Sequence, residues 1–136
     1  MGIIKNTTGK GQQGFTLIEI TIAISILTIA LLGLISVTVM VVKGNAFSKT
    51  MTTATTLAGD RLEAIKNTSY AAIPSGVTTD YINADLSAGV AGAFYTRTLT
   101  VDASNPEVRA IQVEVSWQWA GSTRRVRVNT IMADTG

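Results

Sequence analysis

The chain has neither cysteine nor histidine among its 136 residues, and it has only two prolines. These absences exclude disulfide bridges, cysteine-rich zinc sites, a histidine general base and the catalytic triads that contain histidine. They leave open enzymes that use a Ser-Lys pair or carboxylates. Charge is also scarce, since Asp, Glu, Lys and Arg make up 15% of the chain and give a net charge of +2. With a mean hydropathy of +0.33 as well, the chain is too apolar for a disordered protein or a typical soluble one.

One uncharged run accounts for most of this apolar character. No charged residue lies between Glu19 and Lys43, so residues 20–42 form a segment of 23 residues, of which 17 are apolar. A helix that spans a bilayer needs about 20 mainly apolar residues. The 93 residues that follow, 44–136, have an ordinary globular composition. The sequence therefore predicts a short basic head, one membrane span over 15–43 and one small soluble domain.

The basic head orients the predicted span. Residues 1–14 contain Lys5 and Lys10 and no acidic residue. A basic segment before the first span stays in the cytoplasm, which places the C-terminal domain on the other side of the membrane. A secretory signal peptide fits less well, because its apolar core would be about 7–15 residues long and would end at a cleavage site with small residues. Hydropathy alone leaves open an uncleaved signal anchor and a specialised processing signal.

Glu19 is the anomalous residue of this region, because it directly precedes the apolar run. An ionisable group at the membrane boundary is costly and is a candidate for function. The simpler interpretation is that Glu19 is hydrated at the level of the headgroups, where the helix N-terminus favours a negative charge. If the chain were cut after Gly14, however, the new α-amino group of Phe15 would be a cation four residues from Glu19. That amine could neutralise Glu19 in the same chain or in a neighbour.

The sequence Gly14-Phe15-Thr16-Leu17-Ile18-Glu19, between a short basic leader and an apolar run, resembles the signature that type IV pilins share with the pseudopilins of type II secretion. The resemblance covers residues 9–42. It implies that a prepilin peptidase cuts after Gly14 on the cytoplasmic side and methylates the new amine of Phe15. It implies that Glu19 pairs with the Phe15 amine of an adjacent subunit during assembly.

The resemblance also implies a location and partners. The span would first hold the subunit in the bacterial inner membrane, with the C-terminal domain in the periplasm, and would then form the packed core of a filament. The implied partners are prepilin peptidase, other pilin or pseudopilin subunits and the assembly platform of the inner membrane. The implied role is structural, without catalysis and without a cofactor.

Two departures from the pattern of major pilins narrow this role. Many major pilins have a proline about midway along the helix, where this chain has Ser36, and many have a C-terminal disulfide loop, which this chain cannot form. Both departures favour a minor pilin or a pseudopilin. More loosely, residues 57–63 and the segment 115–126 resemble PilV-type minor pilins and I-type pseudopilins. We therefore expect a subunit that primes or caps a type IV pilus or a type II secretion pseudopilus.

The remaining residues predict an α+β fold, with a long helix packed against about three antiparallel strands. A stripe of apolar residues at helical spacing predicts that the helix continues over 44–69 and ends near Ser69. This stripe contains Phe47, Met51, Ala54, Ala58, Leu62 and Ile65. In the C-terminal domain, 70–136, we expect a surface loop over 70–93 with room for a short helix or strand. Alternating residues predict strands over 94–101, 111–119 and 124–132, with a turn around Pro106 and a hairpin loop at 120–123.

Two further groups of residues suggest other functions. Asp80 and Asp85 are candidate calcium ligands, but calcium needs six to eight oxygens and no compact acidic motif accompanies them, so no metal is predicted. Arg124, Arg125 and Arg127 form a basic cluster, which suggests the alternative of a DNA-binding minor pilin in competence uptake. Against it, residues 15–136 hold 9 Lys+Arg and 9 Asp+Glu, because both leader charges are lysines. No G-x-S-x-G or S-x-x-K motif has supporting context, so no enzyme is predicted.

Overall fold

The computed structural model describes residues 14–134. The chain divides into two compact units, of which the first ends at Val42 and the second begins at Lys43. Residues 1–13 of the predicted leader, including Lys5 and Lys10, lie outside the described residues. The predicted functional boundaries of the leader, span, soluble helix and C-terminal domain stay predictions.

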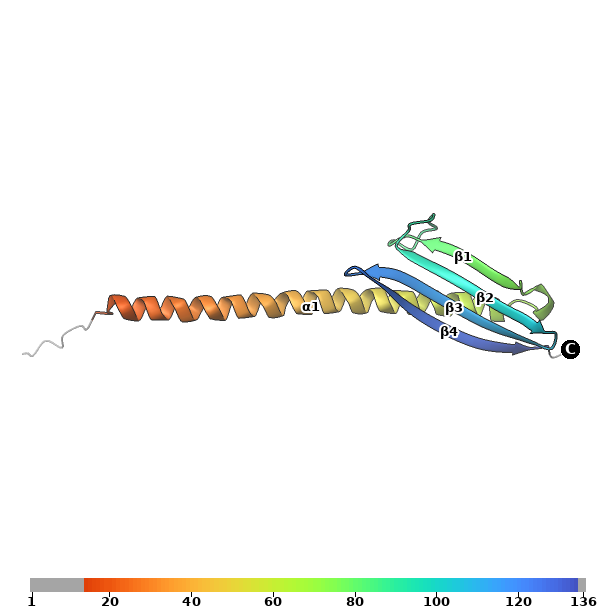
Figure 1. Cartoon of the computed structure of the whole chain (residues 1–136), viewed down its shortest axis with the longest axis horizontal. Helices are drawn as coiled ribbons and strands as arrows, with labels where there is room; N and C mark the ends of the chain where they lie inside the picture. The colour runs from red at the N-terminus through yellow and green to blue at the C-terminus, as the bar shows by residue number, and fades with distance from the viewer. Residues whose placement is uncertain (1–13, 135–136) are drawn as a thin grey trace, which may run out of the picture. The chain divides into compact units, whose positions relative to one another are not determined.

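The elements follow one another in the order helix, short 3-10 helix and four strands (Figure 1). Helix α1 extends over Leu17–Lys66 and belongs to both units, and the 3-10 helix η1 extends over Tyr70–Ala72. The strands are β1 (Gly76–Ile82), β2 (Tyr95–Asn105), β3 (Val108–Trp119) and β4 (Ser122–Ala133). Each strand is antiparallel to the next, and the order across the sheet is β1-β2-β3-β4. The prediction of an α+β fold, with a long helix packed against an antiparallel sheet, is confirmed.

The sheet has four strands and not three, because β1 lies in the segment predicted as a surface loop. Strand β1 contains the β-branched and aromatic residues that favour strands, but only Ile82 is buried, and the alternate positions before it hold the polar residues Thr78 and Asp80. The alternation of apolar and polar residues that marks a half-buried strand is therefore missing. The pairing of β1 with β2 along its whole length stabilises the strand instead.

The turns are shorter than predicted. Strand β2 reaches Asn105 and β3 starts at Val108, so the turn around Pro106 contains only two residues, with an irregular register between Asp102 and Asn105. The hairpin between β3 and β4 is also a two-residue turn and not the predicted loop 120–123, since Trp119 pairs with Ser122. Ala120 and Gly121 have φ angles of 49° and 77°. Positive φ at both positions is typical of a type I′ hairpin turn, whose twist matches that of the strands.

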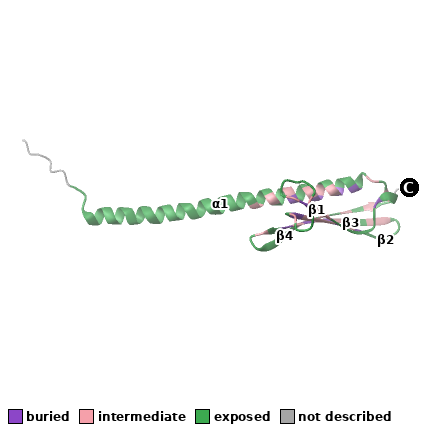
Figure 2. Ribbon diagram, turned by 90° about the horizontal axis from the view of Figure 1, so that it is seen from above, coloured by how far each residue is buried: buried purple, intermediate pink, exposed green. Residues whose placement is uncertain are grey.

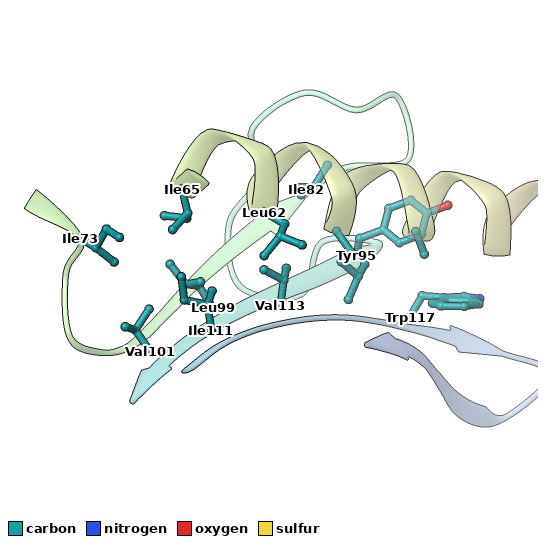
Figure 3. Packing of buried hydrophobic residues seen from close by; sticks show 13 residues of the cluster. Leu62, Ile65, Ile73, Ile82, Tyr95, Leu99, Val101, Ile111, Val113 and Trp117 are labelled. Carbon is teal, nitrogen blue, oxygen red and sulfur yellow. The ribbon is translucent and has the colours of Figure 1, made fainter. Parts of the chain in front are cut away.

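The hydrophobic core lies within the second unit, between the sheet and the C-terminal part of α1 (Figure 2). Figure 3 shows Leu62 and Ile65 of α1 directed toward the strands, where they meet Val113 and its neighbours. Four predicted stripe residues of α1 are buried in this core, namely Ala54, Ala58, Leu62 and Ile65. Phe47 packs against it partly buried, whereas the prediction for Met51 is wrong, since this residue is 47% exposed.

The alternating faces of β3 and β4 agree with the prediction. Buried and less buried positions alternate along β3 from Ile111 to Trp117. On β4, Val126, Val128 and Met132 are partly buried against the core. Helix α1 ends at Lys66, slightly before the predicted Ser69. The amide of Asn67 still donates to the carbonyl of Glu63 at 3.0 Å, so the last turn closes just beyond the helix.

Candidate functional site

The start of α1 is set by Thr16, a residue to which the sequence analysis assigned no role. The backbone amide of Glu19 donates to the Thr16 side-chain Oγ1 at 3.3 Å and to its carbonyl oxygen at 3.1 Å. A threonine that accepts from the amide three residues on is a helix N-cap, which satisfies one of the free N–H groups of the first turn. Thr-x-x-Glu is a known helix-start signature, so this signal was available in the sequence. Gly14 and Phe15 consequently lie outside the helix, and both are exposed.

Glu19 lies in the first turn of α1, as predicted. Within residues 14–134, its carboxylate has no hydrogen bond and no ion pair, although the N-terminal end of the helix favours its charge. Phe15, Glu19 and Ala23 follow one another at four-residue intervals and line one shallow hollow on the helix surface. A cation on the backbone nitrogen of Phe15 would thus stand about one helical turn from this carboxylate.

No residue from Leu17 to Val42 buries its side chain within the chain (Figure 2). This segment is apolar on all sides; Leu32 is 61% exposed and Ile29 is 71% exposed. A helix that is apolar all round is stable when lipid or other apolar surfaces cover it. By length and composition, α1 is the one helix in the described part of the chain that could cross a membrane.

The hydroxyl groups of this apolar segment are all satisfied inside the helix. Each of the five hydroxyl side chains donates to the backbone carbonyl four residues earlier, at 2.8 to 3.0 Å. They are Thr21, Ser25, Thr28, Ser36 and Thr38. An unsatisfied hydroxyl in an apolar medium is costly, so these bonds remove the main obstacle to placing the segment away from water. The helix continues without interruption through Ser36, where many major pilins have proline.

The N-terminal region matches a known protein family. Residues 9–35 match the family profile described as the prokaryotic N-terminal methylation motif. The chain carries the N-terminal methylation motif of type IV prepilin-like proteins. Proteins of the pilin family, which carry this motif, are structural and not enzymes, and the sequence predicts no enzyme here. No curated protein and no solved structure matches the chain. The motif match leaves open whether this pilin-like chain is a minor pilin or a pseudopilin.

The motif match does not test the roles of individual residues. Cleavage between Gly14 and Phe15, methylation of Phe15 and pairing of Glu19 stay predictions. The structure places the three residues within one short stretch at and just before the start of α1, all of them accessible.

The two candidate calcium ligands do not meet. Asp80 lies on β1, where its Oδ2 is 3.1 Å from Arg97 Nη2 and 4.0 Å from Arg61 Nε. Asp85 lies in the following loop, where it accepts hydrogen bonds from the amide and the hydroxyl of Ser87. The hydroxyl bond, followed by the amide bond, holds the pKa of Asp85 below its usual value. Within residues 14–134, no group of three or more His, Cys, Asp or Glu side chains could hold a metal ion.

The three arginines of β4 do not form one basic surface. Arg127 donates to Glu114 on the neighbouring strand at 2.5 Å, and Arg125 is 3.9 Å from the same carboxylate. Arg124 alternates to the other face, where its guanidinium lies 6.0 Å from the ring centre of Phe47. The predicted shared face of Arg125 and Arg127 therefore exists, but Glu114 offsets part of its charge. DNA binding stays the alternative and not the expected function, and salt-dependent retention of the protein on DNA would test it.

Proposed function

We propose that this chain is a minor pilin or pseudopilin that prepilin peptidase processes between Gly14 and Phe15 and that assembles through its N-terminal helix. The observation that carries the proposal is the order of features around the motif. An exposed, non-helical Gly14-Phe15 bond precedes an N-capped helix, and the carboxylate of Glu19 in its first turn has no partner in residues 14–134. The next charged residue is Lys43.

Cleavage after Gly14 creates a positive charge at Phe15 that the carboxylate of Glu19 can neutralise. The new α-amino group of Phe15 is a cation next to the N-terminal end of α1, whose dipole and free N–H groups disfavour positive charge. Glu19 is the first carboxylate of the mature chain. In an apolar environment each of the two charges needs the other. Pairing between neighbouring subunits would neutralise both charges and would set the register of one helix against the next.

In this proposal the apolar segment lies first in the membrane and then in the filament. Before assembly, residues 17–42 cross the bacterial inner membrane once, with the basic leader in the cytoplasm and the C-terminal domain in the periplasm. After assembly, the same exposed apolar surface packs against the helices of other subunits in a pilus or a pseudopilus. The satisfied hydroxyls of this segment suit both environments, because neither provides water.

The proposed pairing is tested by removing one charge. In cells that assemble the filament, we expect the E19Q variant to be inserted and cut like the wild-type chain. Its amount in the sheared filament fraction should fall at least about tenfold, since removing one partner of a buried ion pair costs about 3–5 kcal/mol. The matched control is E63Q, because Glu63 is an exposed carboxylate of the same helix with no hydrogen bond or ion pair in the described part of the chain. Equal incorporation of E19Q and E63Q would contradict the pairing role of Glu19.

A further inference from the structure

A polar hollow lies at the free edge of β1, in the second unit and separate from the N-terminal motif. Its volume is about 540 Å³. The walls come from α1, β1, β2 and the loop after β1, and they include Leu57, Arg61, Asp80, Leu86 and Arg97. Nothing in the motif or in the proposed assembly through the N-terminal helix uses this surface.

The hollow carries an excess of one positive charge. Arg97 is the better satisfied of its two arginines, since it donates to the carbonyl of Leu57 at 3.3 Å and to Asp80 at 3.1 Å. Arg61 has only one ion-pair partner in the described residues, the same Asp80 carboxylate at 4.0 Å. Two guanidinium groups thus share one carboxylate.

The helix itself provides no further anion for Arg61. The residues three and four positions away on α1 are all apolar, namely Leu57, Ala58, Ala64 and Ile65. The Nε atoms of Arg61 and Arg97 are also buried and have no hydrogen-bond partner within residues 14–134. The side chain of Arg61 makes no hydrogen bond in the described residues and is 30% exposed, so its terminal Nη groups are available for a carboxylate that enters the hollow.

The edge of β1 beside the hollow has free backbone groups. The carbonyl of Tyr81 accepts a hydrogen bond from the amide of Gly89 at 2.8 Å, from the side opposite to β2. Backbone groups of alternate residues in a strand point the same way, so those of Thr79 and Val77 also face away from β2. The segment that returns after Ala88 covers the edge at Tyr81, whereas no strand among residues 14–134 pairs with the edge from Val77 to Thr79.

The rim of the hollow presents an exposed leucine in a costly backbone conformation. Leu86 has a φ of 69° and is 56% exposed. A bulky residue in the left-handed region is unusual and persists only where the surrounding structure holds it. The loop does so through the amide of Leu86, which donates to the carbonyl of Asn83, and through the bonds of Asp85 to Ser87.

We propose that an extended segment of another polypeptide adds to the free edge of β1 and places an acidic side chain in this hollow. Backbone groups at Val77 and Thr79 would pair with the segment, as in recognition by strand addition. Arg61 would bind the carboxylate, and Leu86 would contact an apolar neighbour of the acidic residue. The excess positive charge favours an acidic segment, because an uncharged one would leave Arg61 only the Asp80 carboxylate, which it shares with Arg97.

The side-chain N–H signals of Arg61 and Arg97 provide a direct readout. The full chain in detergent micelles, labelled with ¹⁵N, is titrated with the peptide acetyl-Val-Thr-Glu-Leu-Thr-amide and with its counterpart that has Gln in place of Glu. We expect the Glu peptide to shift the Arg61 Nε–H signal and the Thr79 amide signal to saturation. The Gln peptide should bind at least about tenfold more weakly, since a hydrogen bond to a charged carboxylate is roughly twice as strong as one to a neutral amide and the excess positive charge of the hollow would not be neutralised.

Two variants and two small anions complete the test. R61A should weaken binding of the Glu peptide at least about tenfold, whereas R125A, which removes the same charge on β4, should leave it unchanged. The tryptophan fluorescence of both variants checks that they fold. The proposal is overturned if the Glu and Gln peptides bind alike, or if neither shifts the Arg61 signal. It is also overturned if acetate or phosphate shifts this signal as strongly as the Glu peptide, which would indicate a site for free anions.

Discussion

Helix α1 has two parts, residues 17–42 and residues 43–66, which differ in what covers their apolar side chains. Residues 43–66 have one apolar stripe, and four of its members are buried under the sheet of the same chain. Residues 17–42 are apolar on every side, and none is buried within the chain. An amphipathic helix completes a core that its own chain provides, whereas a helix that is apolar all round needs lipid or other helices. The stripe of the second part also uses Ala54 and Ala58, whose small side chains let the sheet approach closely.

The largest expected difference is between two leucine-to-alanine substitutions, one at a buried position of the second unit and one at an exposed position of the first. Leu99 is 2% exposed in the core, and L99A should lower the free energy of unfolding of the second unit by about 2–5 kcal/mol. Leu32 is 61% exposed, and L32A should change this free energy by less than about 0.5 kcal/mol. The measurement is denaturant unfolding in detergent, followed by the fluorescence of Trp117 and Trp119. A loss of stability for L32A as large as that for L99A would contradict the division.

Removal of the negative charge of Asp80 on β1 should lower the free energy of unfolding by less than L99A does. Asp80 lies within ion-pair distance of Arg97 on β2 and Arg61 on α1, and D80N should lower the free energy of unfolding by about 1 kcal/mol. The figure is small because the side chain of Asp80 is 37% exposed and solvent screens the pairs. E63Q is the control, since Glu63 has no ion pair in the described residues. A D80N variant as stable as E63Q would show that strand pairing and packing hold β1 without this charge.

The hairpin between β3 and β4 should become more stable when its first turn residue is one that adopts a positive φ more readily than alanine. Ala120 has a φ of 49°, which an L-alanine adopts at a cost and an asparagine adopts more readily. We expect A120N to raise the free energy of unfolding by about 0.5–1 kcal/mol. G121A should do the opposite, because Gly121 has a φ of 77° although no atom lies within 4 Å of an added Cβ. Unfolding midpoints that move in the reverse directions would exclude a type I′ turn here.

Acid should weaken only the second unit, and this is the smallest effect we expect. Hydrogen bonds from the hydroxyl and then the amide of Ser87 lower the pKa of Asp85, and those from Ser104 lower the pKa of Asp102 in the same way. The unfolded chain therefore binds protons at a higher pH than the folded chain does. The contribution of both groups is complete above the ordinary aspartate pKa of about 3.9 and is lost as the pH falls through the lowered values.

A matched pair of variants separates this effect from general acid unfolding. D85N should flatten the fall in the unfolding midpoint below about pH 4, because its side chain no longer titrates. D60N is the control, since Asp60 has no hydrogen bond or ion pair in the described part of the chain. The same acid dependence in D85N and D60N would show that the bonds to Ser87 contribute nothing.

Features with a strong local signal could be predicted from the sequence. The apolar run of residues 20–42 and the motif around Gly14, Phe15 and Glu19 depend on neighbouring residues alone. The same holds for the helical stripe that contains Leu62 and for the alternation in β3. The stripe and the alternation each reflect a single periodicity, and the structure has the helix and the strand that they predict.

Features that depend on contacts between distant residues could not be predicted in this way. Strand β1 has the polar residue Asp80 at the alternate position before the buried Ile82, and its partner Arg97 becomes visible only once β1 and β2 pair. The hollow at Arg61 likewise needs residues from α1, two strands and a loop. The N-cap at Thr16 is different, since its Thr-x-x-Glu signal was present in the sequence. The same residues belong to the prepilin motif, and only that motif was used to interpret them.

The N-terminus of the protein isolated from membranes tests the central claim most directly. Peptide mass spectrometry of the protein, expressed in cells with an active prepilin peptidase, should find a mature chain that begins at a mono-methylated Phe15. In cells without the peptidase, the same measurement should find residues 1–14 still attached and no methyl group on Phe15. A chain that keeps its leader in the peptidase-containing cells, or that begins at any residue other than Phe15, would contradict the account.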